Sequence, residues 1–224
     1  MEFQLDIQSM INKIAIIDLG IGNILSLKRA LEKNHKNKVL VTNDQNSLME
    51  ADKVILPGVG AFKKAMSTLH KLGLVSVLEK IKKKNKPLLG ICLGMQLLME
   101  ESEEFGLTEG LGFIDGKVVK ISDRHKIKEH FLKVPHIGWN SLNIKNIKHL
   151  NVNQNNILSK TEQNGYVYFI HSYMVTPKNS NNIVATTNYG GHTIVAAVHN
   201  KNITGLQFHP EKSGHIGLKI LENF

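Results

Sequence analysis

The first half of the chain alternates short apolar runs with runs in which apolar residues recur at helical spacing. Parallel strands need a long crossover connection, usually a helix, so this alternation predicts a parallel sheet with helices on both faces. The predicted strands are 13–19, 39–42, 53–56 and 88–91, and the predicted helices are 25–34, 61–72, 75–84 and 95–101.

The second half changes character, because short β-rich runs separated by Gly, Asn and His replace the helical spacing. A last helix is predicted at 214–224. The whole pattern predicts an α/β fold: a three-layer, flavodoxin-like, mostly parallel sheet flanked by helices, with a β-rich C-terminal half. The predicted β-rich runs are 116–121, 166–173, 183–188, 194–199 and 203–208.

The length of 224 residues fits one large domain, predicted at 13–224. Residues 1–12 precede the first strand and are predicted to be a disordered N-terminal extension without the features of a signal peptide. Apolar runs fall far short of the roughly 20 residues that a membrane helix needs. The single cysteine excludes an internal disulfide and predicts a reducing, cytoplasmic location.

The net charge of +9 comes from lysines that are not interleaved with aromatic residues. A solvated basic face explains this excess better than a nucleic-acid surface does. No nucleic-acid or membrane partner is therefore expected. The single cysteine and the scattered histidines lack the spacing of metal ligands, and no cofactor is expected.

The segment Gly90-Ile91-Cys92-Leu93-Gly94 joins an apolar strand to a predicted helix. This is the nucleophile-elbow pattern with Cys in place of Ser. The sharp turn holds the middle side chain clear of the sheet, the flanking glycines give it room, and the helix N-terminus favours a thiolate. A lone Cys is often only a small core residue, but this context favours a nucleophile.

A thiolate nucleophile usually works with a base that is oriented by a third group. His209-Pro210-Glu211 follows a predicted strand, and the proline restricts the chain between the imidazole and the carboxylate. A carboxylate at this distance can accept the second imidazole N–H and fix the tautomer. The alternative is a surface turn in which the two residues are unrelated.

Four segments, GICLGMQLL, QFHPEKS, LPGVGAF and VPHIGWN, together resemble class I glutamine amidotransferases over roughly residues 13–224. More closely, they resemble the glutaminase subunits of imidazole glycerol phosphate synthase. The resemblance implies that Cys92 attacks the side-chain amide of L-glutamine, that His209 transfers protons, and that Glu211 holds His209. It also implies backbone oxyanion donors at Leu93 and Val59.

The resemblance extends to substrate and partner. It implies that the glutamine is bound by Gln96, by the backbone of Ser172 and Tyr173, and by the turn that contains Gly58 and Gly60. The expected partner is a synthase (cyclase) subunit that forms a heterodimer and receives ammonia through a channel. The residues implied at this interface and on the ammonia route are Trp139, Tyr168 and Lys212.

The turn 57–60 has a further implication, because in the resembled family its orientation responds to the partner subunit. We hypothesise that the free chain is a poor glutaminase because the Val59 N–H is misaimed. Trp139 itself lies in a predicted loop. From composition alone, a position at a partner interface and a position in the core are equally plausible for the single Trp of the chain.

Other features leave the ammonia acceptor open. Leu19 and Asp115 depart from the histidine-pathway pattern. The segments 101–106 and 209–221 resemble paralogues that supply ammonia to an N-acetyl sugar amidotransferase in surface-glycan biosynthesis. A stand-alone cysteine γ-glutamyl hydrolase would need no partner. A catalytically silent subunit would have lost a triad residue, and a basic nucleic-acid module would bind polyanions in a salt-dependent way.

Overall fold

The computed structural model describes residues 12–20, 22–34, 37–122, 126–127, 130–145 and 157–224. The predicted N-terminal extension lies outside these residues except for Asn12, which begins the first strand. The predicted domain from 13 to 224 therefore has its first strand one residue earlier than expected.

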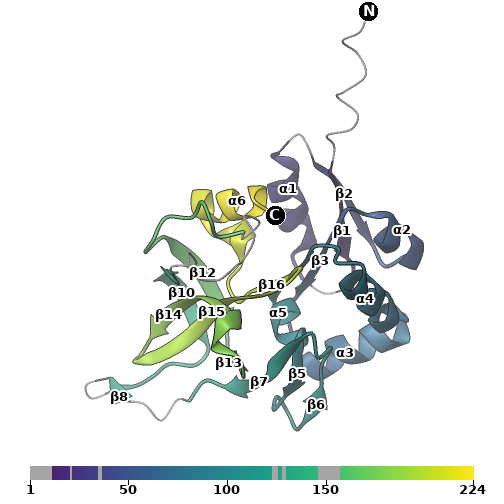
Figure 1. The fold of residues 1–224 in the computed structure, drawn as a ribbon. Coiled ribbons are helices and arrows are strands. Elements are labelled where there is room, and N and C mark those ends of the chain that lie inside the picture. The colour runs from purple at the N-terminus through teal and green to yellow at the C-terminus, as the bar shows by residue number, and fades with distance from the viewer. Residues whose placement is uncertain (1–11, 21, 35–36, 123–125, 128–129, 146–156) are drawn as a thin grey trace, which may run out of the picture.

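A central sheet of eight strands, counted over the described residues, forms the middle layer (Figure 1). Its order is β11-β14-β15-β16-β4-β3-β1-β2, and the five strands from β16 to β2 are parallel. This part has the doubly wound order 2-1-3-4-5, as predicted for a flavodoxin-like fold. The strands are β1 (Asn12–Ile17), β2 (Asn37–Thr42), β3 (Lys53–Gly58), β4 (Leu88–Cys92), β11 (Asn143–Ile144), β14 (Ile183–Tyr189), β15 (His192–Asn200) and β16 (Ile203–Leu206).

Helices cover both faces of this sheet, as the strand–helix alternation predicts. Alternate side chains of β1 point to opposite faces, so that Ile14 and Ile16 join one apolar core and Ala15 and Ile17 join the other. Helices α1 (Ile24–Glu32) and α6 (Gly214–Glu222), from opposite ends of the chain, lie together on the first face (Figure 1). The second face carries α2 (Gln45–Glu50), α3 (Phe62–Lys71), α4 (Leu74–Lys83) and α5 (Leu93–Leu97).

The predicted β-rich half builds further small sheets beside the central one (Figure 1). One sheet has the order β13-β7-β5-β6, another pairs β10 with β12, and a third pairs β8 with β9. These strands are β5 (Met99–Ser102), β6 (Thr108–Glu109), β7 (Ile114–Lys120), β8 (Lys126–Ile127), β9 (His130–Phe131), β10 (His136–Ser141), β12 (Tyr166–His171) and β13 (Tyr173–Pro177), and the 3-10 turns are η3 (Ser180–Asn182) and η4 (Pro210–Lys212).

Some local predictions are wrong in detail. The helix predicted at 95–101 begins earlier, at Leu93, and ends at Leu97, because the next residues form β5 and pair with β6 and β7. The loop predicted around Trp139 is strand β10, which pairs with β12. Strand β3 continues through Pro57, which pairs with Ile91, and α2 was not predicted. In the first two cases, pairing with a distant segment decides the local conformation.

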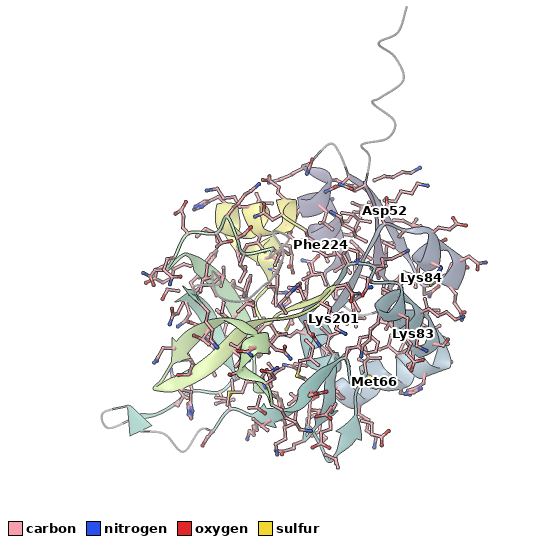
Figure 2. The ribbon with its side chains drawn as sticks, in the orientation of Figure 1. Asp52, Met66, Lys83, Lys84, Lys201 and Phe224 are labelled. Atoms are coloured by element: carbon pink, nitrogen blue, oxygen red, sulfur yellow. The ribbon has the colours of Figure 1, made fainter. Side chains whose placement is uncertain are left out.

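The lysines at and just after the end of α4 lie in two different environments. Lys83 and Lys84 are exposed at the end of α4 (Figure 2). Lys86 turns inward, and its ammonium group donates to the carbonyls of Met49 and Ala51 at the end of α2, where a cation is favourable. Among the described residues, no helix is both long and apolar enough to cross a bilayer.

Candidate active site

Cys92 occupies the sharp turn between β4 and α5, with φ 55° and ψ −109°. This left-handed backbone conformation is rare for a residue with a side chain and is typical of functional sites. The glycines on each side are required by close packing. A Cβ on Gly94 would lie 1.8 Å from the Leu56 carbonyl oxygen, and a Cβ on Gly90 would lie 2.7 Å from the Gly94 carbonyl oxygen.

This packing predicts that replacing Gly94 with alanine destabilises the fold strongly. The obstructing atom belongs to the backbone of β3, so no rotamer change relieves the contact, and we expect a loss of more than about 3 kcal/mol. Gly112→Ala is the matched control, since its Cβ meets nothing within 4 Å and only its φ of +60° is unfavourable. Urea unfolding should show a loss of about 1–2 kcal/mol for the control. Equal losses would contradict the steric explanation.

His209 and Glu211 lie after the neighbouring strand β16. The imidazole Nδ1 is 2.8 Å from Glu211 Oε1, and both side chains are almost fully buried. Pro210 begins the short turn η4, and the His209 N–H donates to the Tyr168 carbonyl oxygen at 2.9 Å. The two residues therefore form a buried hydrogen-bonded pair. This excludes the alternative in which they are unrelated residues of a surface turn.

The charge of His209 is controlled by its neighbours. Burial alone would lower its pKa, but the nearby Cys92 sulfur and the charge and hydrogen bond of the Glu211 carboxylate outweigh burial and raise the pKa to about 10. The buried Nε2 has no hydrogen-bond partner among the described residues. This nitrogen is available for proton transfer once a substrate is bound.

A second histidine near the site is excluded as a base by its surroundings. His171 donates from Nδ1 to the Tyr173 carbonyl oxygen at 2.8 Å and contacts the buried ring of His136. Burial is the main cause that lowers the pKa of His171 to about 3, so its ring is neutral at physiological pH. The raised pKa and the acidic partner set His209 apart from it.

The predicted oxyanion donors lie at two adjacent strand ends. Leu93 is the first residue of α5, directly after the sulfur. Gly58 pairs with Cys92 in the sheet register, so Val59 is one residue beyond the nucleophile on the next strand. The φ of +97° at Gly60 gives the turn after Val59 a conformation that favours glycine.

Gln96 is buried and is not a surface residue of its helix. Its Nε2 donates to the Tyr173 carbonyl oxygen at 3.1 Å and to Gln207 Oε1 at 3.2 Å. The Ser172 carbonyl oxygen accepts from the Ile121 N–H. Gln96 and Tyr173 are thus bonded to each other, and Gln207 connects Gln96 to Cys92.

A shallow pocket opens where the carboxyl ends of β1, β3 and β4 meet His209 and Glu211. Ligands of open α/β sheets bind at this edge. The β1–α1 segment contributes to it and was not predicted as part of the site; its position after the first strand is the signal that could have indicated it. The lining residues are Gly22, Asn23, Ile24, Leu27, Pro57, Gly58, Val59, Ile91, His209 and Glu211.

The pairing of β10 with β12 brings Trp139 to Tyr168, and Lys212 in η4 lies beside Tyr168. Trp139 pairs with Tyr168 in the register, and their rings meet edge to face with centroids 6.0 Å apart. The Lys212 ammonium lies 5.9 Å from the Tyr168 ring centroid. Trp139 is 52% exposed, so the core alternative for this residue is wrong.

Two further residues of the site were missed by sequence reasoning. The Ser213 hydroxyl accepts from the Tyr168 N–H at 3.0 Å and donates to the His209 carbonyl oxygen at 2.6 Å, which ties β12 to the catalytic turn. Gln207 is fully buried beside Cys92. Its place two residues before His209, in the segment QFHPEKS, is the signal that could have found it. Within the described ranges, no group of three or more His, Cys, Asp or Glu could hold a metal.

Solved structures share this fold. PurLQS from Thermotoga maritima superposes with a TM-score of 0.68 at 18% identity, covering 96% of this chain and 97% of that one. A glutamine amidotransferase from Thermotoga maritima gives a TM-score of 0.56 at 20% identity, covering 89% of this chain and 76% of that one.

Curated relatives found by sequence are more similar to this chain than these solved structures are. The chain is 47% identical to the imidazole glycerol phosphate synthase subunit HisH of Oceanobacillus iheyensis, covering 94% of this chain and 97% of the relative. It is 42% identical to the HisH subunit of Aquifex aeolicus, covering 95% of each. The family model of class-I glutamine amidotransferases matches residues 15–224. The protein is therefore a member of the class-I glutamine amidotransferase family.

Proposed function

We propose that this enzyme is the glutaminase subunit of an imidazole glycerol phosphate synthase. It hydrolyses L-glutamine to glutamate and ammonia, and a cyclase subunit uses the ammonia in histidine biosynthesis. One observation carries the proposal: Cys92, at the strained end of β4, lies beside the buried His209–Glu211 pair at the end of the adjacent parallel strand. The HisH relatives, which match nearly the whole chain, support histidine biosynthesis as the pathway that uses the ammonia. A cytoplasmic location belongs to the same proposal.

The chemistry follows from the positions of the three side chains. The Cys92 sulfur attacks the side-chain amide carbon of glutamine, and protonated His209 gives its proton to the leaving nitrogen. The C–N bond breaks, ammonia leaves, and a glutamyl thioester remains on the sulfur. His209 then takes a proton from water, and the resulting hydroxide attacks the thioester, which releases glutamate and restores the thiolate. Glu211 holds the imidazole and stabilises its charge.

The negative oxygen of each tetrahedral intermediate needs donors that are already in place. The N–H groups of Leu93 and Val59 are the proposed donors, since they follow the nucleophile and its register partner Gly58. We propose that the pocket beside them holds the glutamine, with Gly60 allowing the close approach of the turn.

The proposed docking face for the cyclase is one side of the β10–β12 ribbon. The opposite side of the ribbon is buried against the core, whereas this side carries five large apolar or aromatic residues. Four of them are between 39% and 58% exposed, and aromatic residues dominate the energetics of protein interfaces. The five residues are Ile137, Trp139, Tyr166, Tyr168 and Ile170.

The docking face and the catalytic turn share strand β12. The Tyr168 carbonyl accepts the His209 N–H, and the Tyr168 ring lies under Lys212. Ammonia released at Cys92 is therefore only a short distance from the ribbon. We propose that it leaves past Trp139, Tyr168 and Lys212 into the partner, because protonation in bulk water would destroy its nucleophilicity.

Mixing the purified chain with a cyclase subunit of imidazole glycerol phosphate synthase tests the function. We expect a stable complex and glutamine-dependent product formation, with glutamine turnover by the free chain about 10² to 10³ lower because one oxyanion donor is misaimed. A chain that hydrolyses glutamine equally fast alone, and binds no cyclase, would instead support a stand-alone hydrolase.

The variant Trp139→Ala tests the docking face in the same assay. Truncating a central aromatic residue of an interface typically costs at least about 2 kcal/mol, so the Kd for the cyclase should rise about 30-fold. Phe105→Ala is the matched control, because Phe105 is 82% exposed but lies in the β5–β6 connection. Titration calorimetry that shows the same loss for both variants would contradict the assignment of the face.

A further inference from the structure

We propose that Gln207 is a catalytic residue whose side-chain amide donates to the Cys92 sulfur and stabilises the thiolate. The amide nitrogen lies 3.9 Å from Sγ, within the range of the long contacts that sulfur accepts. The proposal rests on the proposed role of Cys92 as nucleophile. It adds a second neighbour, besides the His209–Glu211 pair, that stabilises the charged sulfur.

The sheet register explains why these residues meet although they are 115 positions apart. Strands β16 and β4 are parallel neighbours, and Leu206 pairs with Ile91 at the end of the ladder. Gln207 and Cys92 are the next residues on each strand. Neighbours in register share a face of the sheet, so the amide is directed at the sulfur.

The orientation of the Gln207 amide is determined by its partners. A backbone carbonyl can only accept, so the group of Gln96 that contacts the Tyr173 carbonyl is its amide nitrogen. The same nitrogen contacts Gln207, which must therefore present its oxygen there. The nitrogen of Gln207 is then left to face the Cys92 sulfur, and a flipped amide would break this chain of donors and acceptors.

The Cys92 sulfur also contacts a hydrogen-bond acceptor. The thiol lies 3.8 Å from the Ile170 carbonyl oxygen, which can accept the S–H proton but repels a thiolate. The Ile170 carbonyl therefore favours the neutral thiol, whereas the Gln207 N–H favours the anion. Because Gln207 is fully buried, water does not screen its interaction with the sulfur.

Alkylation by iodoacetamide reports this balance directly, because the thiolate is the reactive species and the chain contains one cysteine. The rate is measured against pH for the native chain and for Gln207→Leu and Gln207→Glu, with circular dichroism confirming the fold. Leucine removes the donor at similar size, and glutamate replaces it with an acceptor. Thr187→Val is the control, since this buried hydroxyl has no hydrogen-bond partner among the described residues.

We expect the leucine variant, which has lost the donor to the charged sulfur, to be alkylated about tenfold more slowly at neutral pH, and the glutamate variant to be slower still. The control should follow the native profile. An unchanged profile in either folded Gln207 variant would overturn the proposal. The measurement needs neither glutamine nor the cyclase, so this failure is distinct from failure of the proposed function, which would show as glutamine turnover without Cys92.

Discussion

Replacement of Cys92 by alanine will abolish glutamine-dependent synthesis in the complex and leave ammonia-dependent synthesis unchanged. Loss of a nucleophile costs about 10⁶ in rate, and no second cysteine in the chain can replace the sulfur. Added ammonia bypasses the glutaminase, because it enters the reaction after the thioester step. Product formation by the complex with either nitrogen donor is the measurement.

In this experiment, the assay with ammonia serves as the control for the assay with glutamine. Retained ammonia-dependent turnover shows that the variant still folds and binds the cyclase. Glutamine-dependent turnover by Cys92→Ala would show that the sulfur at the strained end of β4 is not the nucleophile. Loss of both activities would indicate a disrupted complex, and Cys92→Ser then repeats the comparison with a side chain that preserves the hydrogen-bonding capacity.

Replacement of Glu211 by glutamine will lower glutamine turnover in the complex by about 10² to 10⁴, which is less than the loss of the nucleophile. The amide can still accept the Nδ1–H of His209, so the ring keeps its position. The negative charge that supports the imidazolium is lost. Glu162→Gln is the matched control, because Glu162 pairs with Lys219 on the surface and its side chain is 67% exposed.

The same variant changes how stability depends on pH. The pKa of His209 is about 10 in the folded chain, above its ordinary value of 6.5. The contribution of charged His209 to the free energy of unfolding is therefore fully present below about pH 6.5 and is lost as the pH rises toward about 10. Removing the Glu211 charge lowers the folded-state pKa, so the variant should lose less stability over this range. Urea unfolding across this pH range measures how the free energy of unfolding changes with pH. The same slope in the native chain and in the variant would mean that Glu211 does not raise the pKa of His209.

Local sequence patterns were sufficient to predict the α/β fold class, the strand–helix alternation and the elbow around Cys92. These features depend on near neighbours: apolar period, a glycine on each side of a turn, or a His and Glu two residues apart. Strand β1 and helices α3 and α4 were predicted to within about two residues because their apolar patterns are continuous.

Tertiary structure alone decided which distant residues meet. The register of β16 against β4 brings Gln207 to Cys92, and the pairing of β10 with β12 turns a predicted loop into an exposed aromatic face around Trp139. Pairing with β7 likewise ends the helix after Leu97. Strand pairing is set by hydrogen bonds and packing between segments that are far apart in sequence. No local pattern encodes such a partner. The catalytic turn could be recognised from the sequence, and the resemblance implied interface roles for Trp139, Tyr168 and Lys212, but neither indicated the strand pairing that forms the exposed face or the buried residues that support the turn.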